Sequence, residues 1–171
     1  MLSVIQVVTL LLVAVTMSMA LAHVLEFPGK KRLEKDAYLA VQTIYYPGFT
    51  IAGFAEPVSI IPTILLLFIT PTGSLAFWLT LIAFVSLVVM HAIFWIVTQP
   101  VNKFWLKNQQ LSKLGDRFFS PNSTVQHGEE PNADVEDWEK MRDRWEYSHL
   151  VRAVFCVIAM ITLTVALAMP R

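Results

Sequence analysis

Four long apolar runs, separated by polar stretches, dominate the pattern of the chain. They extend over residues 2–25, 48–70, 75–98 and 150–169. A helix needs about 20 apolar residues to cross a hydrocarbon core roughly 30 Å thick, and each run has that length. The pattern therefore predicts an all-α fold, a bundle of four transmembrane helices that forms a single membrane domain over residues 1–171.

Two longer polar connections, residues 26–47 and 99–149, join these runs. Within the first, residues 33–46 are amphipathic and predict a short helix along the membrane interface. Within the second, residues 102–114 predict a continuation of the third helix, and residues 134–148 predict a charged helix that leads directly into the fourth run. The connections are therefore expected to carry short interfacial helices.

Composition supports a membrane protein and excludes other classes. The chain has 171 residues, of which 56% are hydrophobic, and its mean hydropathy is +0.57. Its 13 basic and 13 acidic residues balance, so no nucleic-acid partner is indicated. A single cysteine, Cys156, excludes an intrachain disulfide. Membrane lipid is the partner that composition does predict.

Basic residues are concentrated in the two long connections, whereas the two termini and the short turn at residues 71–74 are nearly free of them. The basic positions are Lys30, Lys31, Arg32, Lys35, Lys103, Lys107, Lys113, Arg117, Arg142 and Arg144. Positive charge marks the cytoplasmic side of a membrane protein. We therefore predict that both termini lie outside and both long connections lie in the cytoplasm, with the protein in a bacterial inner membrane.

Several ionisable residues lie within or beside different apolar runs at the same predicted depth. Polar groups in hydrocarbon are costly unless they are paired or functional, so their coincidence at one depth predicts a site in the inner half of the membrane. Its candidate members are His23, Glu26, Glu56, His91, His149 and Arg152.

Two kinds of chemistry fit these residue types. Imidazole and carboxylate groups on facing helices can hold a transition metal such as iron or copper, with His23, Glu26, Glu56 and His91 as the candidate ligands. Alternatively, the site uses no cofactor, and one histidine acts as a general base while Arg152 stabilises a developing oxyanion. The residues alone leave both alternatives open.

The same residues also have structural interpretations. His23 and Glu26 can simply be solvated at the end of the first helix. His149 and Arg152 can anchor the fourth helix at the membrane interface. His91 and Glu56 are predicted about two turns inside the membrane, where a structural hydrogen bond is the competing explanation.

A candidate substrate pocket lies near the interface. Tyr45 and Tyr46 suit the headgroup layer, because an aromatic ring can be half buried there while its hydroxyl stays wet. Together with Trp145, at the head of the fourth run, they are the residues that we expect to line a pocket for a lipophilic small molecule.

Short motifs around the third and fourth runs carry a family resemblance. Residues 97–102 read Val-Thr-Gln-Pro-Val-Asn, and a Trp-x-x-x-His-x-x-Arg pattern at Trp145, His149 and Arg152 enters the fourth run. In these parts the chain resembles the anthrone oxygenase-like (DUF1772) family of small four-helix membrane proteins. The resemblance implies a four-helix bundle and, as in characterised fungal members, oxygenation of an anthrone to an anthraquinone. It also marks Asn102 as a shared position.

We therefore predict a membrane-embedded oxidoreductase, a monooxygenase acting on a lipophilic aromatic or quinone-like substrate in an inner-leaflet pocket. Its candidate catalytic residues are His149 as base or ligand, Arg152 as anion stabiliser, Asn102 as an orienting donor, and His91. The alternative is a non-enzymatic accessory or scaffold subunit, whose polar cluster holds helices together in a homo-oligomer or a larger membrane complex. A self-contained transporter is disfavoured, since the chain shows no internal repeat.

Overall fold

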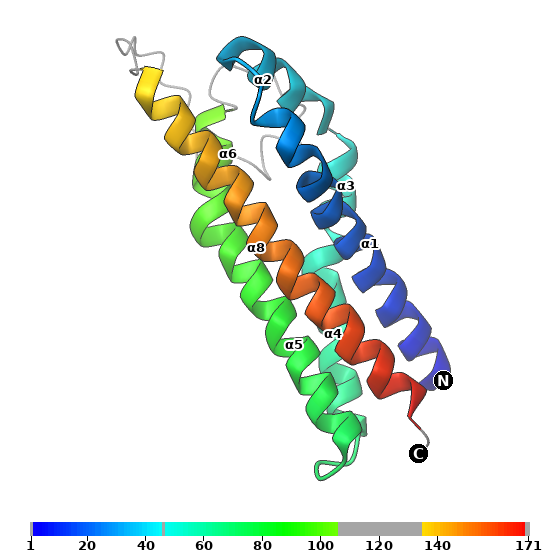
Figure 1. The fold of residues 1–171 in the computed structure, drawn as a ribbon. Coiled ribbons are helices and arrows are strands. Elements are labelled where there is room, and N and C mark those ends of the chain that lie inside the picture. The colour runs from blue at the N-terminus through cyan, green and yellow to red at the C-terminus, as the bar shows by residue number, and fades with distance from the viewer. Residues whose placement is uncertain (1, 46, 106–134, 170–171) are drawn as a thin grey trace.

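The apolar runs form long helices that lie side by side in a bundle (Figure 1). The computed structural model describes residues 2–45, 47–105 and 135–169. Within these residues, four helices are long and apolar enough to cross a membrane, which confirms an integral membrane four-helix bundle. The elements are α1 (Leu2–Lys30), α2 (Lys35–Gln42), η1 (Thr43–Tyr45), α3 (Gly48–Gly53), α4 (Ala55–Ile69), α5 (Leu75–Ile93), η2 (Phe94–Thr98), α6 (Gln99–Trp105) and α8 (Val135–Ala168).

The four spans pack as a ring. α8 packs against α1 and α5, and α4 packs against the same two helices. α4 and α8 therefore face each other across the diagonal of the bundle. Both termini and the turn between α4 and α5 lie at one end, whereas α2 lies at the other (Figure 1). This places η1, α3 and the first turns of α8 near the end of the bundle that carries α2.

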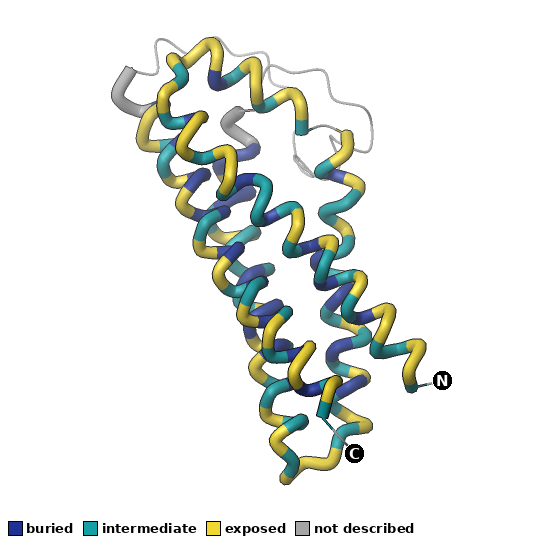
Figure 2. The backbone as a smooth tube through the Cα atoms, turned by 45° about the vertical axis from the view of Figure 1, so that its right-hand side comes forward, coloured by how far each residue is buried: buried dark blue, intermediate teal, exposed yellow. Residues whose placement is uncertain are grey.

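Buried positions recur along the inner faces of the helices and exposed positions along their outer faces (Figure 2), and many of the exposed residues are large and apolar. One buried cluster contains Val13, Leu66, Ala83, Leu87, Ala159 and Leu163. Exposed apolar residues such as Leu11 and Phe68 suit contact with membrane lipid rather than with water. Buried threonines within the core donate to the carbonyl four residues earlier, and they include Thr9, Thr16, Thr63 and Thr80.

The second span is interrupted just before Glu56. Pro57 has no amide hydrogen, so the carbonyl of Gly53 cannot receive the usual helical bond from residue 57. The structure accordingly ends α3 at Gly53 and begins α4 at Ala55. Glu56 therefore stands in the first turn of α4.

The third span contains a π-helical turn, η2, which is five residues long. The amide of Gln99 donates to the carbonyl of Phe94, five residues back. Pro100 cannot donate to the carbonyl of Ile96, and Arg144 of α8 donates to it instead at 3.4 Å. Such turns often occur at functional sites. This one lies between His91 and Asn102.

The helices extend beyond some of the predicted boundaries. α1 continues through Pro28 to Lys30, because the buried Lys30 is paired with α8. The charged segment and the fourth run form one continuous helix, α8, as predicted. The predicted helix over residues 102–114 is described only as far as Trp105, and the rest lies outside the described residues.

Adjacent leucines on α4 give a test of the packing. Leu66 is 1% exposed, whereas Leu65 is 47% exposed. We expect Leu66→Ala to lower the free energy of unfolding by about 2–4 kcal/mol, because it leaves a cavity and removes packing contacts. Leu65→Ala should cost less than about 1 kcal/mol, since lipid replaces the lost contacts. Unfolding of the two variants in mixed micelles measures both values, and equal costs would contradict this arrangement.

Candidate functional site

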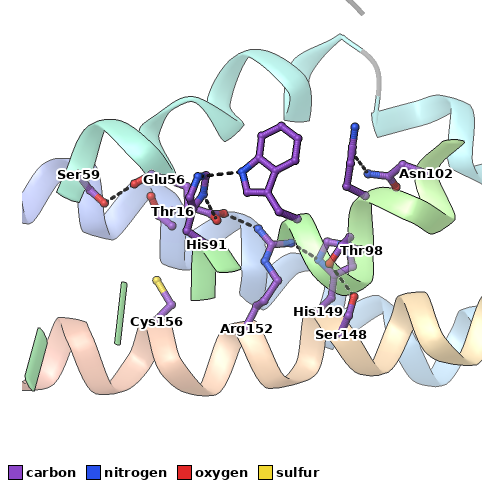
Figure 3. Close-up of polar contacts among 12 residues, drawn as sticks. Thr16, Glu56, Ser59, His91, Thr98, Asn102, Ser148, His149, Arg152 and Cys156 are labelled. Atoms are coloured by element: carbon purple, nitrogen blue, oxygen red, sulfur yellow. Dashed lines mark hydrogen bonds and ion pairs between the residues drawn. The ribbon is translucent and has the colours of Figure 1, made fainter. Parts of the chain in front are cut away.

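An ion pair crosses the diagonal of the bundle between α4 and α8. Arg152 Nη2 donates to Glu56 Oε2 (Figure 3). Glu56 is 6% exposed and Arg152 is 7% exposed. A buried charge must be paired, and each of these two residues neutralises the other. The pair therefore joins two helices that face each other across the core.

The second oxygen of Glu56 fixes the tautomer of His91 on α5. Glu56 Oε1 lies 3.1 Å from His91 Nδ1, and Trp95 Nε1 donates to His91 Nε2 at 2.9 Å (Figure 3). An indole nitrogen can only donate and a carboxylate can only accept. His91 is therefore neutral, with its proton on Nδ1, and Glu56 and His91 form a carboxylate–imidazole dyad.

Arg152 also fixes the tautomer of His149, one turn earlier on α8. Arg152 Nη1 lies 3.1 Å from His149 Nδ1. Because a guanidinium can only donate, His149 Nδ1 accepts and the neutral ring carries its proton on Nε2. The Nε2 atom is buried and has no hydrogen-bond partner among the described residues. This bond favours a donor role for His149 over the role of base.

Aromatic rings surround the buried end of this network. The ring centroids of His23 and His149 lie 4.0 Å apart, and those of Trp145 and His149 lie 4.2 Å apart. Tyr45 and Phe49 also contact His23, at 4.7 and 5.0 Å between centroids. The two histidines are thus held in a cage of rings from α1, η1, α3 and α8.

Asn102 orients Trp145 rather than lining the cavity. Trp145 Nε1 donates to Asn102 Oδ1 at 2.7 Å, and Asn102 Nδ2 donates to Gln99 Oε1 at 3.2 Å. Nearby, the hydroxyls of Thr98 and Ser148 lie 2.9 Å apart and join η2 to α8 (Figure 3). These bonds fix the ring that packs against His149.

A small cavity lies within the network. Its volume is about 30 Å³, and its lining consists of Thr16, Met19, Ala20, His23, Ala52, Gly53, Glu56, Met90, His149 and Arg152. A cavity needs about 10–15 Å³ to hold a water molecule, whereas pockets for drug-sized ligands measure roughly 300–1,000 Å³. The cavity therefore fits a ligand of a few atoms but not a polycyclic aromatic molecule.

A second buried cluster lies beyond the cage. Lys30 Nζ lies 3.0 Å from Glu146 Oε1, and the hydroxyl of Tyr38 donates to the same oxygen at 2.9 Å. The hydroxyl of Tyr45 donates to Glu26. Burial and the neighbouring carboxylates raise the pKa of Tyr38 and of Tyr45 well above the usual value, so both hydroxyls stay protonated. These bonds hold α2 and η1 against α1 and α8.

The four candidate metal ligands do not come together. Glu56 pairs with His91, His23 packs on His149, and Glu26 accepts from Tyr45. Within residues 2–45, 47–105 and 135–169, no group of three or more His, Cys, Asp or Glu side chains is placed to hold a metal ion. A bound iron or copper ion stays a prediction that these residues, as placed, do not support.

Most of the candidate site residues lie at or next to the cavity. His23, Glu56, His149 and Arg152 line one cavity, and His91 reaches it through Glu56. Among the three predicted pocket residues, Tyr45 and Trp145 contact His23, whereas Tyr46 lies outside the described residues.

Two contributors were missed in the sequence. Trp95 bonds to His91, and its position four residues after His91 on the same helix was the signal for it. Glu146 lies in a charged stretch and gave no signal of burial.

Fold and network together define an integral membrane helix bundle with an ionised, hydrogen-bonded core. A family model described as anthrone oxygenase matches residues 42–162, which is most of the chain. The chain therefore belongs to the anthrone oxygenase family, as the motifs at residues 97–102 and at the head of the fourth run indicated. No curated protein and no solved structure matches it significantly.

The diagonal ion pair can be tested by a double-mutant cycle. Glu56→Gln and Arg152→Gln should each lower the free energy of unfolding by about 3–5 kcal/mol, because each leaves a buried charge without its partner. The double variant should lose much less than the sum, since both charges are gone. As a control, Lys31→Gln breaks a partly exposed pair with Asp143, which keeps its bond to Arg142, and should cost about 1 kcal/mol or less. Additive costs at Glu56 and Arg152 would contradict the pairing.

Proposed function

We propose that the protein is a membrane oxygenase that oxidises an acidic methylene group of a lipophilic aromatic substrate with O₂. The observation that carries this proposal is the Glu56–His91 dyad, which lies inside the membrane-spanning part of an anthrone oxygenase family member. Ionisable groups at such a depth are costly and mark functional sites.

The dyad is suited to general-base catalysis. A carboxylate that accepts from Nδ1 holds an imidazole in the tautomer whose Nε2 lone pair can take a proton, and it stabilises the imidazolium that forms. In His91 that lone pair accepts from Trp95 Nε1. Trp95 is 47% exposed, so rotation of its side chain toward the lipid frees Nε2 without a change in the backbone.

The position of His91 suits a substrate dissolved in the membrane. Its side chain is 29% exposed, and apolar side chains such as Trp95 and Ile96 are exposed on the same segment of the third span. The inner cavity is too small for a fused-ring aromatic. The aromatic substrate therefore approaches His91 from the lipid-facing side.

The proposed reaction balances with O₂ as the only oxidant. His91 Nε2 takes one proton from the methylene carbon, and the carbanion gives one electron to O₂. The resulting carbon radical and superoxide form a C–O bond, and the peroxide oxygen takes the proton back from His91. The hydroperoxide then breaks its O–O bond and loses water with the second hydrogen of the carbon. The net change is CH₂ + O₂ → C=O + H₂O.

The remaining candidate residues take supporting roles in this proposal. Arg152 keeps Glu56 ionised and places it, and His149 presents the N–H of its Nε2 atom at the buried end of the network. Asn102 is a positioning residue, since it acts through Trp145. His91 is the group that we expect to contact the substrate.

Oxygen consumption by the purified protein with an anthrone tests the role of His91. We expect His91→Ala to lower kcat by roughly 100-fold or more, because a positioned general base contributes about that much. Anthrone deuterated at the methylene carbon should show a primary isotope effect on the intact protein. Trp78→Phe, at an exposed position near the opposite end of α5, is the control and should retain full activity.

Unchanged turnover in a folded His91→Ala variant would contradict the proposal. Loss of folding in this variant, with no oxygen uptake by the intact protein above the spontaneous rate, would instead favour the alternative of a scaffold subunit held together by its polar network.

A further inference from the structure

We propose that the cavity lined by His23, His149 and Arg152 is a binding site for a small anion that accepts hydrogen bonds. This inference rests on the proposed function, in which the anion is the superoxide formed when O₂ takes an electron from the carbanion. The cavity is distinct from the lipid-facing surface at His91, and Glu56 connects the two.

Unsatisfied nitrogen atoms indicate what the cavity binds. Among the described residues, His23 Nδ1, His149 Nε2 and Arg152 Nε are buried and have no hydrogen-bond partner. His149 Nε2 carries a hydrogen because Nδ1 of the same ring accepts from Arg152, and the Nε of a guanidinium always carries one. All three side chains are more than nine-tenths buried. Burying a donor without a partner is unfavourable, and a ligand with acceptor atoms would remove that penalty.

The size of the cavity limits the ligand to a few atoms. Its volume of about 30 Å³ exceeds the space for one water molecule and is far below that of an aromatic pocket. Gly53 contributes part of the wall. A β-carbon added there would meet only Met19 Cε, at 3.9 Å. The missing side chain therefore leaves room in the cavity wall next to Met19.

The charges around the cavity predict modest affinity. Glu56 already neutralises Arg152, and His149 is neutral. An anion is therefore held by N–H donors rather than by an excess of positive charge, in the way that an oxyanion hole holds its ligand. Binding in the millimolar range is expected, and this suits an intermediate that must leave the site.

Azide is a suitable probe, because it is a linear anion of three atoms. We expect the infrared stretching band of azide to show a shifted, saturable component with the purified intact protein. His149→Phe removes one donor and should weaken azide binding roughly tenfold. Gly53→Ala keeps every donor but narrows the cavity, and we expect a similar loss of affinity. Trp78→Phe, near the opposite end of α5, is the control and should bind azide as the wild type does.

The absence of a shifted band in the wild-type protein would overturn the inference. So would a band of unchanged affinity in both His149→Phe and Gly53→Ala, since it would place the anion elsewhere. Gly53→Ala keeps the test decisive if His149→Phe fails to fold. Azide binding is measured without turnover, so loss of the role of His91 and loss of the anion site are separate results.

Discussion

The ion pair between Glu56 and Arg152 is the constraint on which the rest of the site depends. A charge near the middle of a bilayer costs at least about 2.5–3.5 kcal/mol, and each of these residues removes that cost for the other. The pair connects α4 with α8, the two helices that face each other across the bundle. It therefore fixes how both helices are rotated about their axes, and with them the side chains on the inner faces.

The hydrogen bonds on either side of this pair have only one consistent direction. Trp95 donates to His91, His91 donates to Glu56, and Arg152 donates both to Glu56 and to His149. The network therefore has two different ends. The outer end, near the lipid, has a lone pair covered by one exposed indole, whereas the inner end presents N–H groups to a small cavity. A base and an anion site are the chemistries that these two ends separately suit.

The sequence was sufficient for the four spans, because bilayer thickness sets helix length, and it grouped His23, Glu56, His149 and Arg152, which line one cavity in the structure. It could not reveal which charges meet. Glu26 was grouped with His23 because both lie at the end of the first run, at the same predicted depth. In the structure the Glu26 side chain is 43% exposed and accepts from the hydroxyl of Tyr45, whereas His23 is buried and packs on His149 and on the ring of the same tyrosine. The contact between Glu146 and Lys30 depends on how α1 packs against α8, which no local pattern encodes.

The family match covers only part of the site. It begins at residue 42, so it includes Glu56, His91, Asn102, Trp145, His149 and Arg152 but leaves out α1. His91 and the ion pair thus belong to the matched part, whereas His23 is supplied by a helix outside it. His23 lines the cavity and packs on His149, so α1 completes the buried end without contacting the dyad through any bond that the structure shows. We infer that changes in α1 would alter how the small ligand is held while leaving the base at His91 in place.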